Sequence, residues 1–289
     1  MEKKFLLVGA LLLAGGFSTM NADVIYVTES GSGDGTSWSS AASLEDALSW
    51  AAAGDEVFVA KGTYTGSFKL RAAAKVYGNC VGTETEPPTY TTAEGLETFL
   101  KGPGGKRVLY LDGKASEIYG LDISGGDAST ETTGVGRGGG VYINDGGATL
   151  KYCNIHDNIG VDGSKNILGS NGKALKGVGG GLYVLNGRLE NCIIENNIAT
   201  TAPWEDTSKT WSTGIGGGIC LDATEGNGCN PDNAIVLNCI IRNNSTTPTD
   251  DGDSFQSQGG GIAIKSGKLI NSLVVGNSVN GSLNNQSVG

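Results

Sequence analysis

The sequence predicts an all-β protein, a right-handed parallel β-helix (solenoid) with a short N-terminal capping helix. A glycine triplet followed by alternating apolar residues occurs four times, beginning at Gly138, Gly179, Gly216 and Gly259, at spacings of 41, 37 and 43 residues. An apolar run that ends in asparagine follows each triplet, and no copy carries a helical stripe. Short strands that repeat without intervening helices indicate stacked coils, and the crossover rule makes the coil right-handed.

Superposition of the copies gives columns of like residues, which are typical of positions that stack in successive coils. One column holds Cys153, Cys192 and Cys239, which we expect to face inward as small apolar groups. Another column holds Asn158, Asn197, Asn244 and Asn277, whose amides we expect to hydrogen-bond along the stack at a corner. The glycine triplets fit sharp corners, where a Cβ would collide with the next coil.

The chain divides into four parts. Residues 1–22 are interpreted as an export signal, residues 23–112 as the cap and irregular first coils, residues 113–280 as regular coils and residues 281–289 as a tail. Lys3 and Lys4 precede an apolar run over Phe5–Phe17, which is too short to span a bilayer but is typical of a signal peptide. We therefore expect an exported protein that is extracellular, or located at the cell surface or outer membrane.

The first coils are less regular than the later ones. Strands are predicted over Val24–Val27, Glu56–Ala60, Lys75–Gly78 and Arg107–Leu111. A helix is predicted over Ser43–Ala53, with Ser43 as its N-cap and Gly54 as its stop, and is placed over the open N-terminal end of the solenoid. The other end shows no comparable cap, so we expect a truncated chain, or a further domain or chain that covers this edge.

The composition argues against several classes of protein. The formal net charge of −10 and the pI of about 4.6 disfavour nucleic acid as a partner. The chain has a single histidine, which argues against most histidine metal sites and a Ser-His-Asp triad. No cofactor is expected, and no further apolar run is long enough to span a membrane.

The glycine and asparagine motifs resemble the repeats of polymorphic outer membrane proteins. The matching pairs are Gly138–Val141 with Ile155–Asn158, Gly179–Leu182 with Ile194–Asn197, Gly216–Ile219 with Ile241–Asn244, and Gly259–Ile262 with Val274–Asn277. In this chain Ile or Val replaces the Phe of the apolar-x-x-Asn motif. The upstream segments Gly33–Trp38, Ala53–Tyr64, Lys75–Glu86 and Ile118–Gly126 resemble secreted β-helix proteins with the pectin-lyase-like fold. The resemblance implies the fold, and for function it implies either surface adhesins or polysaccharide lyases and hydrolases.

Aromatic residues provide two candidate glycan sites. The loops over 159–178, 198–215 and 245–258 leave the same corner, and Trp204 and Trp211 in them could form a glycan platform or pack on outward apolar residues. Tyr142 and Tyr183 occupy matching outward positions. This pair could face solvent and stack sugars, or stabilise adjacent strands as a cross-strand pair.

One outward column and one acidic loop provide catalytic and metal-binding candidates. His156, Glu195 and Arg242 share one outward column, which could be a lyase trio or a ladder of alternating charge. No outward column places Asp or Glu on adjacent coils, so we expect no pair of converging carboxylates for a hydrolase. Asp250, Asp251 and Asp253 could bind calcium or form a solvated turn.

The remaining cysteines allow one disulfide. Cys220 and Cys229 bracket an insertion in the third copy, and a bridge between them would close a short loop. Stacked Cys153, Cys192 and Cys239 lie within bridging range but cannot all pair.

The sequence favours an exported binding or adhesin-like module, whose ligands would be glycans or host or cell-surface molecules, over an enzyme. The alternative is a polysaccharide lyase or glycoside hydrolase. A third interpretation is a structural spacer stalk. Because a fold does not by itself give a function, the choice depends on the geometry of the outward side chains.

Overall fold

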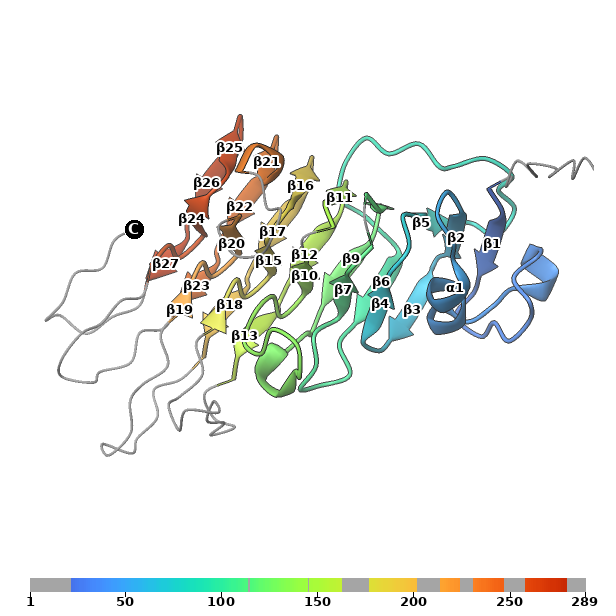
Figure 1. The fold of residues 1–289 in the computed structure, drawn as a ribbon, viewed down its shortest axis with the longest axis horizontal. Coiled ribbons are helices and arrows are strands. Elements are labelled where there is room, and N and C mark those ends of the chain that lie inside the picture. The colour runs from blue at the N-terminus through green and yellow to red at the C-terminus, as the bar shows by residue number, and fades with distance from the viewer. Residues whose placement is uncertain are drawn as a thin grey trace, which may run out of the picture.

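The computed structural model describes residues 22–279 except 114, 145, 163–176, 202–213, 224–230 and 247–257. Its strands stack along one axis, coil upon coil, and every pairing between them is parallel (Figure 1). The predicted right-handed parallel β-helix is confirmed. Three sheets, here called A, B and C, form the walls of the coil, and a fourth, D, runs along one corner.

The bounds of the elements follow. Sheet A contains β1 (Val24–Val27), β2 (Glu56–Ala60), β5 (Lys75–Cys80), β8 (Glu117–Tyr119), β11 (Ala148–Lys151), β16 (Gly187–Glu190), β21 (Ile235–Leu237) and β25 (Lys268–Ile270). Sheet B contains β3 (Gly62–Thr65), β6 (Thr98–Lys101), β9 (Asp122–Ser124), β12 (Asn154–His156), β17 (Ile193–Glu195), β22 (Ile240–Arg242) and β26 (Leu273–Val275). Sheet C contains β4 (Phe68–Leu70), β7 (Leu109–Leu111), β10 (Val141–Ile143), β15 (Leu182–Val184), β20 (Ile219–Asp222) and β24 (Ile262–Ser266).

The smaller elements lie at the corners. Sheet D contains β13 (Ile159–Val161), β18 (Ile198–Thr200), β23 (Ser245–Thr246) and β27 (Ser278–Val279), and β14 (Gly177–Val178) pairs with β19 (Gly214–Ile215). The helices are η1 (Trp38–Ser40), α1 (Leu44–Trp50), η2 (Ala128–Thr130) and η4 (Pro231–Asn233). No helix in the described ranges is long and apolar enough to cross a membrane.

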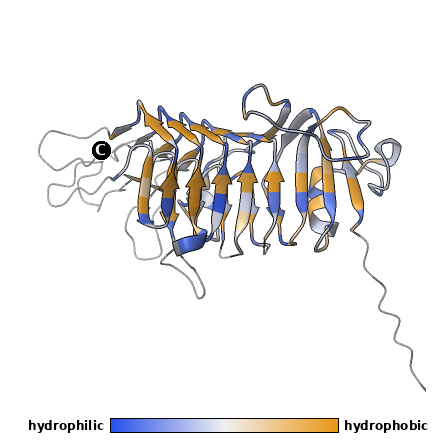
Figure 2. Ribbon diagram, turned by 90° about the horizontal axis from the view of Figure 1, so that it is seen from above, coloured by the Kyte–Doolittle hydropathy of each residue, from blue (hydrophilic) through white to orange (hydrophobic). Residues whose placement is uncertain are grey.

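The core fills the bore of the coil with stacked aliphatic side chains. Leu150, Leu189, Val236 and Leu269 pair in register from β11 to β25, as the columns predict. The three stacked cysteines Cys153, Cys192 and Cys239 are buried in this core, so the inward placement of that column is confirmed. Figure 2 shows the neighbouring strands of one wall side by side along the axis, largely hydrophobic at their centres.

The asparagine column forms a continuous hydrogen-bonded ladder. The backbone N–H and the Nδ2 of Asn158 both donate to Oδ1 of Asn197, at 3.1 and 3.0 Å. Asn197 donates in the same way to Asn244 at 3.0 and 2.9 Å, and Asn244 to Asn277 at 2.9 Å in both bonds. The predicted stacking of these amides is therefore confirmed, and it satisfies polar groups that would be costly to bury alone.

The glycine triplets pack directly against this ladder. Only the first glycine of each triplet adopts the left-handed region, with φ between +58° and +65°. A Cβ on the second, Gly180, would lie 2.4 Å from the carbonyl oxygens of Gly217 and Ile198. A Cβ on the third, Gly181, would lie 2.8 Å from Nδ2 of Asn197. The glycine triplet of each coil and the asparagine of the ladder thus pack against each other, and we call this pair the asparagine joint. The asparagine side chain fills the space at the corner, so a Cβ on the glycines does not fit there.

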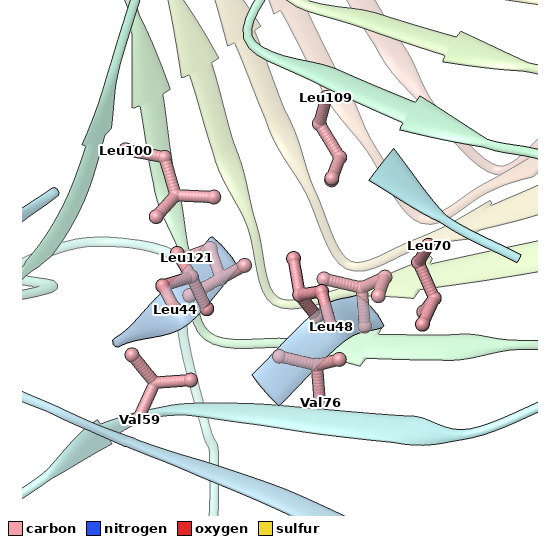
Figure 3. Close-up of a pocket in the computed structure, with 9 residues that line it drawn as sticks. Leu44, Leu48, Val59, Leu70, Val76, Leu100, Leu109 and Leu121 are labelled. Carbon is pink, nitrogen blue, oxygen red and sulfur yellow. The ribbon is translucent and has the colours of Figure 1, made fainter. Parts of the chain in front are cut away.

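The N-terminal end is closed by α1. Ser43 is its N-cap, and Oγ of Ser43 accepts a hydrogen bond from the N–H of Asp46 at 3.1 Å. The helix ends at Trp50, earlier than the predicted Ala53, because the Asp55 carboxylate accepts from the N–H of Ala52 at 2.8 Å and favours an extended exit. Leu44 and Leu48 point into the bore, where they meet leucine and valine side chains from all three walls around a small apolar cavity (Figure 3). The predicted capping helix is confirmed.

Candidate functional site

The outer face of sheet B carries a strip of polar and aromatic side chains, which we call the sheet B strip. Its members come from β6, β9, β12, β17 and β22 and from the turn after β12. They are Phe99, Lys101, Asp122, Asn154, His156, Asp157, Glu195 and Arg242. His156, Glu195 and Arg242 pair in register on successive strands, which is the column that the sequence predicts.

His156 lies between two carboxylates. Its Nε2 is 2.9 Å from Oδ1 of Asp122 on the preceding coil, and its Nδ1 is 2.7 Å from Oδ2 of Asp157 in the adjoining turn. Asn154 donates from Nδ2 to the other oxygen of Asp122 at 3.1 Å. The Asp122 side chain is largely buried, whereas Asp157 is exposed.

This environment favours the imidazolium form of His156. A neutral imidazole has one donor nitrogen, whereas both ring nitrogens here face carboxylate oxygens. The hydrogen bonds to Asp122 and then to Asp157 raise the pKa of His156 to about 9, although partial burial opposes the rise. At neutral pH the side chain is therefore a cation and has no lone pair with which to accept a proton.

Arg242 is also paired. Its Nε donates to Oε2 of Glu195 at 2.7 Å, across adjacent coils. The predicted trio is thus two ion pairs, one from His156 to Asp122 and one from Arg242 to Glu195. This geometry agrees with the interpretation as a ladder of alternating charge.

Sequence reasoning missed Asp122 and Asp157. The expectation that no two carboxylates converge is wrong, because these two meet at His156 from different positions of the coil. Asp122 lies in the outward column beside that of His156, and Asp157 occupies the left-handed corner position, with φ of +52°. A search within one column finds neither, whereas a search of diagonal neighbours would have found Asp122.

Tyr142 and Tyr183 do not form a solvent-facing pair. They pair in register on sheet C with tilted rings whose centroids are 5.1 Å apart, but their exposed fractions are only 5% and 0%. Val178 of β14 and Ile215 of β19 pack over them, and Arg137 lies 5.0 Å from the Tyr183 ring. The alternative interpretation, a stabilising cross-strand pair, fits this arrangement.

Several predicted site residues lie outside the described residues. They are Trp204, Trp211, Asp250, Asp251, Asp253 and Cys229. Cys220 is described and is buried beside Tyr183, so its bridge to Cys229 stays a prediction. Among the residues that the structure describes, no group of three His, Cys, Asp or Glu side chains could hold a metal ion.

No family model matches the chain, and no curated protein matches it. Three solved structures are similar to it. The chain is 12% identical to pectate lyase Pel9A, with a TM-score of 0.33 over 91% of this chain and 79% of that one. It is 13% identical to a pectin methylesterase from Aspergillus niger, with a TM-score of 0.35 over 86% and 85%. It is 15% identical to an alginate lyase from Paenibacillus sp. str. FPU-7, with a TM-score of 0.28 over 90% and 99%. At these identities the likeness concerns the fold alone.

Proposed function

We propose that the chain is an exported β-helix that binds glycans on the sheet B strip. The observation that supports this most is the composition of the strip. The half-buried Phe99 pairs in register with Asp122, and His156 and Arg242 follow on later coils. An aromatic ring beside planar charged groups can pack on the C–H face of a sugar while the polar groups bind its hydroxyls.

The charge of the strip favours an uncharged glycan. With His156 protonated, the strip holds three cations, Lys101, His156 and Arg242, and three anions, Asp122, Asp157 and Glu195. The strip is therefore close to neutral, while the whole chain carries a formal charge of −10. A polyanion would be repelled by the whole molecule and would find no excess of positive charge in the strip.

The pairing of the charges supports binding rather than cleavage by a lyase. His156 is protonated and held by Asp122, and Arg242 is held by Glu195. A lyase requires a base that removes a carbon-bound proton, and the raised pKa of His156 disfavours it as that base near neutral pH. The paired groups are instead held in fixed positions, which lowers the entropy cost of binding a ligand.

Affinity electrophoresis of residues 23–289 in gels containing neutral or acidic polysaccharides tests this proposal. We expect retardation by at least one neutral polysaccharide, and a loss of about tenfold in affinity for Phe99→Ala and for Arg242→Ala, equivalent to about 1.4 kcal/mol. Lys268→Ala, at the far edge of sheet A, is the matched control and should bind as the unaltered protein does. Retardation that all three variants retain would place binding elsewhere, and no retardation by any polysaccharide would overturn the proposal.

A second candidate, glycoside hydrolysis, is favoured by the two carboxylates at His156. In this scheme His156 would give its proton to the oxygen of the leaving sugar, and a water would attack the anomeric carbon while Asp157 or Asp122 takes the water's proton. The test is the release of new reducing ends from the same polysaccharides. Release that disappears in Asp122→Asn and His156→Gln would support the hydrolase, whereas retardation without release supports the binding module.

A further inference from the structure

The last described coil, β24 to β27, exposes apolar side chains, two of them at inward positions that the preceding coil buries. Five of the eight exposed large hydrophobic residues in the described ranges belong to it, and they are Ile264, Ile270, Leu273, Val274 and Val275. Val274 occupies the same inward column as Ile241 of the preceding coil. Ile241 is 0% exposed and Val274 is 43% exposed, because a coil covers the first and none of the described residues covers the second.

The asparagine ladder reaches the same edge and leaves donors open. In each earlier coil the backbone N–H and Nδ2 of the asparagine donate to Oδ1 of the next one. Asn277 accepts from Asn244 and donates from Nδ2 to the Ile241 carbonyl. Among the described residues, nothing accepts from its N–H. The position that Oδ1 of a further asparagine would occupy is thus defined by three identical steps before it.

The opposite end of the solenoid differs in shape and charge. The helix α1 fills the bore there with Leu44 and Leu48 (Figure 3). Residues 22–56 hold seven acidic residues and no Lys or Arg. A second copy that approached the exposed edge by its N-terminal end would bring a helix and an acidic cap, which offer neither a parallel coil nor an asparagine.

We infer that the edge formed by β24–β27 is a docking surface for one further coil from another polypeptide. The coil that docks there would have the pattern of the coils within this chain. It would be a parallel, extended segment with a glycine corner, aliphatic residues at the inward positions and an apolar-x-x-Asn run. Such a coil would bury the inward-facing Ile264 and Val274, pair the free strand edges and place an Oδ1 against the Asn277 N–H.

A binding assay with the full chain tests this inference. The probe is a labelled 22-residue peptide with the sequence of residues 258–279, which is itself one coil of the required pattern. We expect saturable binding and new protection of the amides over 262–279 in hydrogen exchange. A peptide carrying N277A should bind at least tenfold more weakly, because the ladder would lack its acceptor.

The protein variant Val274→Lys should weaken binding of the peptide by at least tenfold. Val81→Lys, at an exposed valine of a distant loop, is the matched control and should leave binding unchanged. Thermal unfolding of both variants identifies any loss of fold, and the N277A peptide keeps the test valid if Val274→Lys does not fold. Absence of binding, equal binding of both peptides, or self-association of the chain that protects the same amides would each overturn the inference.

Discussion

The first and the later coils share three walls but stabilise them differently. In the first coils, Tyr26, Phe58, Tyr77 and Tyr119 pair in register on the outside of sheet A, with neighbouring ring centroids 4.9 to 5.8 Å apart. In the later coils the outside of sheet A has no such column, and stability comes from the asparagine ladder and the glycine corners.

The difference shows how regular and irregular coils tolerate insertions. An aromatic column needs only that the strands of sheet A stay in register, so the chain between them can vary in length. The asparagine joint needs an equivalent partner on both sides, so every later coil repeats its glycines and asparagine. The joint therefore makes each later coil dependent on its neighbours, as in other solenoids.

The largest expected effect comes from breaking the ladder within the later coils. Asn197→Ala removes the acceptor that the N–H and Nδ2 of Asn158 share, which leaves the buried Asn158 N–H without this partner while Nδ2 keeps the carbonyls of Ile123 and His156. We expect the free energy of unfolding to fall by about 3 kcal/mol, measured by urea denaturation. Asn277→Ala is the control, because it removes the equivalent two bonds from Asn244 at a half-buried position that water can reach, and it should cost clearly less. Equal costs would mean that the ladder does not couple the coils.

A slightly smaller effect is expected at the corner of the same coils. Gly180→Ala forces a Cβ to within 2.4 Å of two backbone carbonyl oxygens and should lower the free energy of unfolding by about 2 to 3 kcal/mol. Gly104→Ala, in the first coils, has φ of +83° but open space around it, so only the backbone strain of about 1 kcal/mol applies. Chemical denaturation of the two variants compares a crowded corner with an open one. Equal losses in the free energy of unfolding would show that the close packing around Gly180 does not add to the cost of a Cβ.

The corresponding test of the first coils is Leu48→Ala in α1. Leu48 is buried against the aliphatic side chains of the first coils, and its truncation should cost about 2 kcal/mol. Hydrogen exchange should show the loss of protection concentrated in β1–β7, with the later coils unchanged. Loss of protection throughout the solenoid would show that the two regions unfold as one unit.

The smallest expected effect lies where the two regions meet, at Asp122 of β9 and His156 of β12. Because the pKa of His156 is raised to about 9 from 6.5, the folded protein binds more protons than the unfolded chain between these values. Stability is thus full below pH 6.5 and falls as the pH rises through 9, by about 1 kcal/mol after allowance for solvent. His156 is the single histidine, so an NMR titration reads its pKa directly, and Asp122→Asn should lower that pKa. A pKa near 6.5 for His156 in the unaltered protein would show that the ion pair with Asp122 does not form.

The sequence by itself determined what repeats. The glycine triplets and the column from Asn158 to Asn277 predict stacked coils, since equivalent residues at a recurring spacing stack only if the backbone recurs with them. From these the parallel solenoid and the inward cysteines follow, and the helix at Ser43 follows from its capping signals.

The tertiary structure alone decided the contacts between residues at unequal spacings. One aromatic column brings together rings that 32, 19 and 42 residues separate in the sequence, and its members are Tyr26, Phe58, Tyr77 and Tyr119. Tyr183 is covered by Val178 and Ile215, which lie on strands that only the later coils possess. The lengths of the intervening loops set these contacts through the register of the strands, and no local pattern in the sequence encodes that register.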